Sequence, residues 1–171
     1  MNPFWIFVFF LILQRLAELA FAKRNETIVR TKGAIEFDKD GYIFIVFMHV
    51  AFFISLVMEK VFLERSLNTL WVFFAALFVL AQFLRYWAIS SLGVYWNTRV
   101  LVVPNSKLVS SGPYKYLRHP NYVAVITEIA MIPLIFSCYI TAVVFSFINL
   151  VLLRRRVNIE EEALNLVSKG L

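Results

Sequence analysis

Residues 121–153 read NYVAVITEIAMIPLIFSCYITAVVFSFINLVLL, and this stretch decides what kind of fold the chain can adopt. It is almost entirely apolar, and a helix crosses the roughly 30 Å hydrocarbon layer of a bilayer in about 20 apolar residues. The stretch divides at Ser137, just after Pro133, into two short segments, 121–136 and 138–153. We therefore expect a tight helical hairpin embedded in a membrane.

Three further apolar segments precede this hairpin, at residues 3–22, 42–63 and 69–90. Hydrophobic residues make up 61% of the chain and charged residues 16%, whereas soluble domains average about 45–50% and about 25%. The mean hydropathy is +0.75. The first segment lacks the basic start and cleavage site of a secretory signal, so we expect it to be retained. These features predict an all-α integral membrane bundle of about five transmembrane helices, forming one domain over residues 1–171.

Composition also excludes several classes of site. Cys138 is the single cysteine and there are two histidines, so neither a disulfide nor a protein-built metal site is expected. The net charge of +6 does not indicate nucleic-acid binding, because no folded basic domain accompanies it. In a membrane protein the same charge favours contact with anionic lipid headgroups. Nothing in the sequence indicates an obligate protein partner.

The distribution of basic residues predicts the orientation of the bundle. They gather in three regions. The loop after the first span holds Lys23, Arg24, Arg30, Lys32 and Lys39, and the loop after the third span holds Arg99, Lys107, Lys115 and Arg118. The C-terminal tail holds Arg154, Arg155, Arg156 and Lys169. With five crossings these three regions share one side of the membrane, and basic loops mark the cytoplasmic side. We expect the N-terminus outside and the C-terminus in the cytoplasm, with a cytoplasmic helix over residues 154–168.

The loop over residues 91–119 is long for so compact a chain, and long ordered loops are usually functional. Its apolar run at residues 100–103 is expected to pack on the membrane face. At its end stands GPYKYLRHPNY, residues 112–122. Pro120 pre-sets a helix start, which places Arg118 and His119 at a helix N-terminus that favours anions. An ordinary basic, aromatic anchor at the membrane surface is the alternative.

A second polar segment, RRRVNIEEEAL, covers residues 154–164. Ion pairs along a helix surface would explain it, since Arg156 and Glu160 are four residues apart. The helical period, however, also places Asn149, Arg156 and Glu160 on one face. A polar stripe that descends into a bilayer is costly unless it lines a cavity.

Ionisable side chains also occur inside the predicted spans: Arg15, Glu18, Arg85 and Glu128. Each charge at the centre of a bilayer costs on the order of 2.5–3.5 kcal/mol, and such residues usually face the bundle interior. Arg15 and Glu18 are three residues apart and are expected to pair locally. Arg85 needs a partner from another helix, for which Glu128 is a candidate.

Together these motifs resemble the isoprenylcysteine carboxyl methyltransferase family, including its small bacterial and archaeal members. The resemblance rests on residues 112–114, on 118–122 and on the Arg156-Val157…Glu160-Glu161…Leu164 pattern, and it extends back to 85–98. The two main motifs, in this order around a hydrophobic hairpin, are fairly specific, whereas either one alone is weak.

The resemblance implies a bundle whose cytoplasmic loop and C-terminal helix enclose S-adenosylmethionine, with a lipid-side tunnel for the acceptor. Carried over position by position, it implies these cofactor-binding residues: Tyr116, Arg118, His119, Pro120, Tyr122, Glu160 and Glu161. It places Arg156 nearest the reacting group, and Arg156 or Arg85 is expected to orient the acceptor. Asn158 and Ile159 stand where eukaryotic members have acids, so which two of Glu160, Glu161 and Glu162 form the functional pair stays open.

The acceptor also stays open. A prenylcysteine-type carboxylate and an acidic hydroxyl of an alkylpyrone or related polyketide lipid are the two O-methylation candidates. The alternatives are N-methylation of a phospholipid headgroup, an NADPH-dependent membrane reductase of similar architecture, and a non-catalytic membrane scaffold. Three consecutive glutamates are a poor site for the 2′-phosphate of NADPH, which counts against the reductase.

Overall fold

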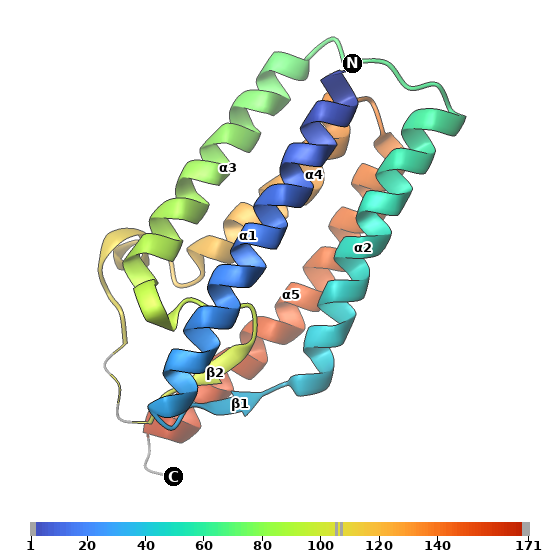
Figure 1. The fold of residues 1–171 in the computed structure, drawn as a ribbon. Helices are drawn as coiled ribbons and strands as arrows, with labels where there is room; N and C mark the ends of the chain where they lie inside the picture. The colour runs from blue at the N-terminus through green and yellow to red at the C-terminus, as the bar shows by residue number, and fades with distance from the viewer. Residues whose placement is uncertain (1–2, 105, 107, 169–171) are drawn as a thin grey trace.

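The computed structural model describes residues 3–104, 106 and 108–168; Lys107 and Lys169, two of the basic residues used above, lie outside the described residues. Five long helices run side by side, and a small two-stranded sheet lies at one end of the bundle (Figure 1). The elements are α1 Pro3–Thr31, β1 Ile35–Phe37, α2 Lys39–Phe62, α3 Trp71–Leu92, η1 Gly93–Tyr95, β2 Val100–Val102, η2 Gly112–Lys115, α4 Pro120–Ile135 and α5 Tyr139–Ser168.

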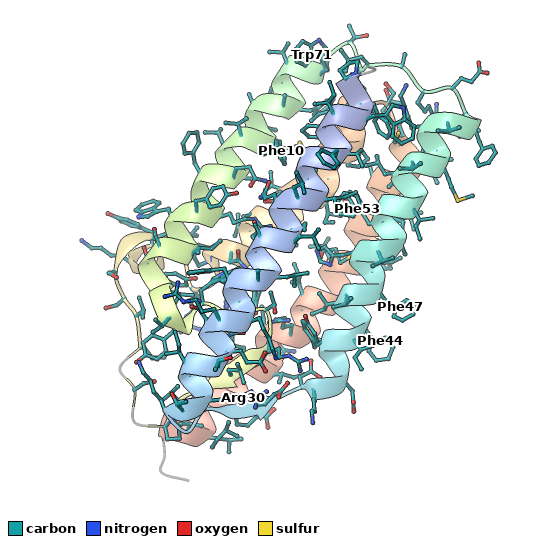
Figure 2. The ribbon with its side chains drawn as sticks, in the orientation of Figure 1. Phe10, Arg30, Phe44, Phe47, Phe53 and Trp71 are labelled. Carbon is teal, nitrogen blue, oxygen red and sulfur yellow. The ribbon has the colours of Figure 1, made fainter. Side chains whose placement is uncertain are left out.

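The outer surface of the bundle is apolar, as expected of a membrane protein. Phe10, Phe44 and Phe47 are exposed, and the side chains of Phe44 and Phe47 point away from the bundle (Figure 2). An exposed apolar surface of this extent is unfavourable in water and favourable in lipid. Three described helices are long and apolar enough to cross a membrane: α1, α2 and the segment Trp71–Tyr95 that begins with α3. Helix α4 is apolar but shorter.

Helices α4 and α5 form the predicted hairpin. Ser137 adopts a left-handed conformation with φ 55° at the joint, and the Cys138 amide donates to the Pro133 carbonyl at 2.9 Å. Helix α5 differs from the expectation, because the predicted span 138–153 and the predicted helix 154–168 are one continuous helix of 30 residues. At 1.5 Å per residue it is roughly 45 Å long. The C-terminal half of α5, which has a polar face, is therefore continuous with the N-terminal half that packs in the apolar bundle.

The start of α5 is capped by a side chain from α2. Glu59 accepts hydrogen bonds from the backbone amides of Ile140, at 3.2 Å, and Thr141, at 2.7 Å, and from the Thr141 hydroxyl at 2.8 Å. Amides in the first turn of a helix have no partner within the helix, and a carboxylate there is also favoured by the helix dipole. Glu59 thus joins two helices by a cap that the sequence pattern did not indicate.

The two-stranded sheet corrects the expectation for the long loop. Residues 100–102 form β2, which pairs antiparallel with β1, and the side chains of Val100 and Val102 are buried within the protein. Val100 and Val102 pack against Ala163 and Val167 of α5. Here the C-terminal half of α5 gains a small core of its own, separate from the main core of the bundle.

The main core fills the other end of the bundle with aromatic and branched side chains. Ring pairs join α1 to the hairpin and α2 to α5: Phe4 lies 4.9 Å from Phe136, and Phe52 lies 5.7 Å from Phe145, both edge to face. Between this core and the small one around β2 lie the polar residues described next.

Candidate active site

The turn at the start of α4 holds two rings together. Pro120 is the first residue of α4 and His119 precedes it as the N-cap. Proline suits this position because its missing N–H would have no helical partner and its φ is already helical. The rings of His119 and Tyr122 stack 5.2 Å apart with 8° between their planes. The turn therefore gives both side chains one fixed orientation.

A hydrogen-bonded chain links this turn to α5 and to the long loop. The Arg156 Nε donates to the Tyr122 hydroxyl oxygen at 3.0 Å, and Arg156 Nη2 donates to the Thr98 carbonyl at 2.7 Å. The Tyr122 hydroxyl in turn donates to a carboxylate oxygen of Glu160. Arg156 is buried, so these bonds hold its guanidinium in place at the level where α4 begins.

Glu161 faces the same turn through weaker contacts. Arg118 Nη1 lies 3.3 Å and His119 Nε2 3.5 Å from Glu161 Oε1, and His119 Nδ1 lies 3.8 Å from Glu160 Oε2. The Arg118 side chain is 86% exposed and that of Glu161 42%. Exposed ion pairs contribute only about 0.2–1 kcal/mol. A cationic ligand can therefore replace Arg118 beside Glu161 at little cost.

The Gly-Pro-Tyr segment packs under the same acids. Gly112 has φ +59°, and a Cβ added there would lie 2.0 Å from Ser91 Oγ, so η2 requires a glycine where it meets the end of α3. Tyr114 follows two residues later. Burial and the negative charge of Glu160 both raise the pKa of the Tyr114 phenol above its ordinary value. This phenol stays protonated and can serve as a hydrogen-bond donor.

Two of the predicted positions lie away from these contacts. Tyr116 is largely exposed, and its ring lies 5.9 Å from the Lys115 ammonium. Glu162 is exposed and, with Asn158, Glu161, Asn165 and Leu166, lines an open groove of about 440 Å³ on the surface of α5. Of the three consecutive glutamates, Glu160 and Glu161 are therefore the two that contact the turn at residues 118–122.

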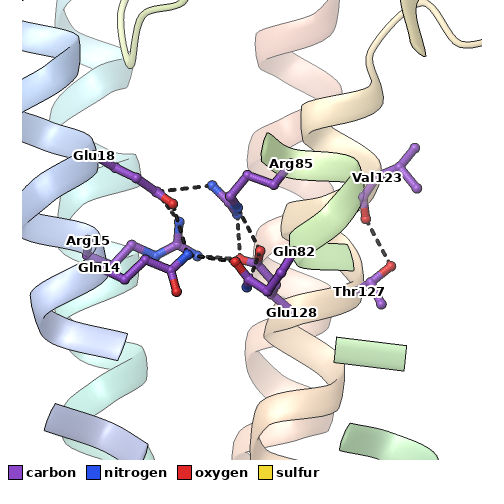
Figure 3. Close-up of polar contacts among 8 residues, drawn as sticks. All are labelled: Gln14, Arg15, Glu18, Gln82, Arg85, Val123, Thr127 and Glu128. Carbon is purple, nitrogen blue, oxygen red and sulfur yellow. Dashed lines mark hydrogen bonds and ion pairs between the residues drawn. The ribbon is translucent and has the colours of Figure 1, made fainter. Parts of the chain in front are cut away.

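A second polar cluster lies deeper in the bundle, between α1, α3 and α4 (Figure 3). Glu128 has no exposed surface and accepts from Arg85 Nε at 2.7 Å and from Gln82 Nε2 at 2.9 Å, and it also pairs with Arg15. Glu18 lies 2.7 Å from Arg15 and 3.3 Å from Arg85. We call the four charged residues, Arg15, Glu18, Arg85 and Glu128, the buried charge cluster.

The buried charge cluster bears on two predictions. Arg15 and Glu18 pair locally as predicted, and Arg85 finds its partner in Glu128 on a neighbouring helix. The two arginines and two glutamates balance one another, so the cluster has no net charge. No contact described for Arg85 joins it to Arg156, Tyr122 or Glu160. The structure therefore places Arg85 in the cluster and not in the chain that orients Arg156.

The loop that supplies Thr98 is held by residues that the sequence did not single out. Buried Asn25 donates to the carbonyls of Trp96, at 2.8 Å, and Gly93, at 3.1 Å. Next to it, Glu36 accepts from Arg30 and Arg99, at 2.5 Å each. Burial opposes ionisation of Glu36, but these hydrogen bonds and charges outweigh it and hold the pKa of the carboxyl below its ordinary value. Asn25 stands within the polar run KRNET, residues 23–27, so nothing in the sequence distinguished it from its neighbours.

The donor set of the site fits an amino-acid-like ligand that carries both charges. Glu160 and Glu161 offer carboxylates to a cationic group. Asn97 and Asn121 are the sequence neighbours of Thr98 and Tyr122, and their buried atoms Asn97 Nδ2 and Asn121 Oδ1 have no hydrogen-bond partner among the described residues. Buried polar atoms are nearly always bonded, so a free donor and a free acceptor on residues adjacent in sequence to those of the site suit a polar ligand. The methionine end of S-adenosylmethionine, with its ammonium and carboxylate, has this chemistry.

Comparison with known proteins agrees with the motifs. The chain is 47% identical to the uncharacterized protein YpbQ of Bacillus subtilis (strain 168) over 161 residues, which are 94% of this chain and 96% of that protein. It is 28% identical to an uncharacterized protein of Haemophilus influenzae over 152 residues, 88% of each. No solved structure matches the chain. The family model for isoprenylcysteine carboxyl methyltransferases matches residues 73–166, which include every motif described above from Arg85 to Leu164. The chain belongs to the isoprenylcysteine carboxyl methyltransferase family.

Proposed function

We propose that this membrane protein is an S-adenosylmethionine-dependent O-methyltransferase that acts on a lipophilic acceptor at the cytoplasmic face of the membrane. Membership of the family implies methyltransferase activity in a membrane protein. The observation that carries the rest is the contact of α5 with the start of α4. There Glu160 and Glu161 face His119 and Tyr122, and Tyr122 bonds to Arg156.

Glu160 and Glu161 would hold the cationic end of the cofactor. S-adenosylmethionine supplies, when bound, a methyl group on a positively charged sulfur. Two carboxylates in a partly desolvated site favour its ammonium by charge-assisted hydrogen bonds. Asn97 Nδ2 is available to donate to the carboxylate end. Arg118, which is mostly exposed, would leave Glu161 as the ammonium takes its place.

Arg156 would hold the acceptor oxygen. Its Nε and Nη2 are already committed to Tyr122 and Thr98, so the guanidinium is oriented before any substrate arrives. A carboxylate or an acidic enol is largely ionised at neutral pH and needs no strong general base. Arg156 then contributes by positioning that oxygen, and positioning can supply several kcal/mol, up to roughly 7–11 kcal/mol when orientation is complete.

The acceptor would reach this site from the lipid. We propose five crossings with the N-terminus outside, in which α4 and the first half of α5 form the last hairpin. β1, β2 and the C-terminal end of α5 lie at the end of the bundle opposite the N-terminus (Figure 1). A lipid with an apolar tail, either a prenylcysteine-type carboxylate or an acidic hydroxyl of a polyketide lipid such as an alkylpyrone, can keep its tail in the bilayer while its head reaches Arg156.

Binding of the cofactor is the most direct test. We expect purified protein in lipid nanodiscs to bind S-adenosylmethionine saturably in isothermal titration calorimetry. The double substitution Glu160→Gln with Glu161→Gln should weaken binding roughly tenfold or more, because hydrogen bonds to charged groups contribute about 1.5–3 kcal/mol each.

Glu162→Gln is the matched control, since it removes the same charge from the next residue, which does not contact the turn at residues 118–122. We expect its affinity to stay within about twofold of the wild-type value. Folded wild-type protein without saturable binding would refute the proposal, and equal losses in E162Q and the double variant would refute the assignment of the two acids.

A further inference from the structure

Asn149, in the middle of α5, has a buried side chain that makes no hydrogen bond to any residue that the structure describes. It is 1% exposed, and neither its amide nitrogen nor its amide oxygen has a partner among the described residues. Buried side-chain amides nearly always make hydrogen bonds, because desolvation without a partner is unfavourable. Two free atoms on one fully buried side chain therefore need an explanation, and a bound molecule supplies one.

Contacts of α5 with its neighbours define the depth of Asn149. Against α2, Thr141 contacts Ser55 and Phe145 contacts Phe52, so the helices are antiparallel, and one more turn brings Asn149 beside residues 48–49. Against α4, Tyr122 contacts Arg156, and two turns along this antiparallel pair bring Asn149 beside residues 128–129. Asn149 therefore lies at the level of the buried charge cluster.

Asn149 also lies on the same face of α5 as Arg156. Seven residues separate them, which is two helical turns or roughly 10 Å along the axis. Side chains on a helix lean toward its N-terminus, so the Arg156 side chain leans from the cytoplasmic end of the site toward Asn149. A head group that enters from the lipid would meet Asn149 before it reaches Arg156.

The charges at this depth restrict what can bind there. The buried charge cluster is paired internally and has no net charge. An ionised group at the level of Asn149 would therefore meet no unpaired arginine or lysine among the described residues. The other titratable side chain at this depth is His49 of α2, whose Nδ1 bonds within its own helix to the Ile45 carbonyl. The amide of Asn149 is neutral and offers one donor group and one acceptor, which suits an uncharged hydroxyl or carbonyl.

We propose that Asn149 binds the head group of the methyl acceptor through an uncharged oxygen that lies between the reacting oxygen and the apolar tail. This inference rests on the proposed function and narrows its substrate class. The acceptor would be a lipid whose head carries at least two oxygen functions, one at Arg156 that receives the methyl group and a neutral one at Asn149. A simple long-chain carboxylate lacks the second function and would be a poor acceptor.

The test compares Asn149→Leu with wild type in three measurements. The methyl acceptor is a lipid extract from cells in which the gene has been deleted, supplied below saturation with radiolabelled S-adenosylmethionine. We expect at least a tenfold loss of methyl transfer in N149L, with cofactor affinity within twofold of wild type. Thermal stability should be unchanged or higher, because the substitution removes two unbonded polar atoms from the interior.

Two further variants make the result decisive. Thr127→Val is the matched control, since it removes a hydroxyl from α4 whose hydrogen bond among the described residues is to the Val123 carbonyl of its own helix (Figure 3). It should leave all three measurements unchanged. Asn149→Ala removes the same amide without adding bulk. If the leucine variant does not fold, the three measurements are made on the alanine variant instead.

Each remaining outcome counts against one claim. Undiminished methylation by the folded Asn149 variants would overturn the assignment, as would a marked loss of thermal stability in N149A, which would indicate a structural role. A methylated product with a single oxygen function in its head, identified by mass spectrometry, would overturn the substrate class. Wild-type protein that methylates nothing in the extract would refute the proposed function itself and the inference with it.

Discussion

At the scale of the residue, the same side-chain type has different roles at two depths of the bundle. Arg156 bonds to a neutral hydroxyl and a carbonyl, so its charge is not cancelled by a direct ion pair in the described contacts. Arg85 is instead bonded to Glu128 and lies 3.3 Å from Glu18. An arginine with its charge free to meet an anion suits substrate binding, and one paired with carboxylates suits helix packing. The catalytic role expected for Arg85 as an alternative to Arg156 therefore has less support from the structure.

The role of Arg85 can be tested through stability. Arg85→Met should lower the free energy of unfolding by about 3–5 kcal/mol, because removing one partner leaves an unbalanced buried charge. The double variant Arg85→Met with Glu128→Leu should recover most of this loss, since it restores the balance. Thermal unfolding in detergent would measure both. Equal stabilities of the single and double variants would show that Arg85 and Glu128 are not coupled.

At the scale of the element, α5 is the structure on which the site depends. Its first turn lies in the apolar core, its middle carries Asn149, and its last turns carry Arg156 and the two acids. The position of the helix along its axis decides which of these residues meet α4. Glu59 and the short connection at residues 136–138 hold the beginning of α5, whereas Ala163 and Val167 pack its end on β2.

Loss of the cap from Glu59 should weaken the whole hairpin. Glu59→Gln removes the charge that accepts two backbone amides and a hydroxyl, and we expect a loss of stability of about 0.5–2 kcal/mol, the range for helix caps. Glu64→Gln is the control, because Glu64 is an exposed acid just beyond the end of α2. Chemical denaturation followed by tryptophan fluorescence would compare them. Identical midpoints for the two variants would argue against the cap.

At the scale of the whole molecule, polarity is distributed along the bundle axis. The end that holds the N-terminus and the hairpin tip is packed mainly with apolar and aromatic side chains, with Glu59 and Asn68 as buried polar exceptions. The buried charge cluster and Asn149 lie at an intermediate level, and the turn at residues 118–122 with the two acids follows further along the axis. The two-stranded sheet lies at the end opposite the N-terminus (Figure 1). This gradient suits a protein that takes a cofactor from water and an acceptor from lipid.

The proposed orientation can be tested with engineered cysteines in a Cys138→Ser background. Ser66→Cys, in the exposed loop between α2 and α3, should react with a membrane-impermeant maleimide in intact cells. Ser110→Cys, in the exposed part of the long loop, should react only after the membrane is opened. Labelling followed by gel shift would read out both positions. The reverse pattern would place the site on the outer face and contradict the proposed topology.

Properties that depend on neighbours in sequence were determined by the sequence itself. Hydrophobic length predicted the membrane bundle and the hairpin, because burial in lipid depends on the local run of apolar residues. The motifs at residues 112–122 and 156–164 identified the family, and the helical period placed Asn149, Arg156 and Glu160 on one face.

Pairings between distant residues were decided only by the tertiary structure. Helix propensity and hydropathy contain no information on which helix meets which, so the partners of Glu59 and Tyr122 emerge only when the helices pack. For Arg85 the sequence offered Glu128 as a candidate partner, and the packed helices confirm it. The continuity of α5 and the strand at residues 100–102 also depend on that packing, because Val100 and Val102 have a buried surface only where the end of α5 covers them. The lack of a hydrogen-bond partner for the Asn149 side chain among the described residues also depends on tertiary packing, since the partner would have to come from a neighbouring helix.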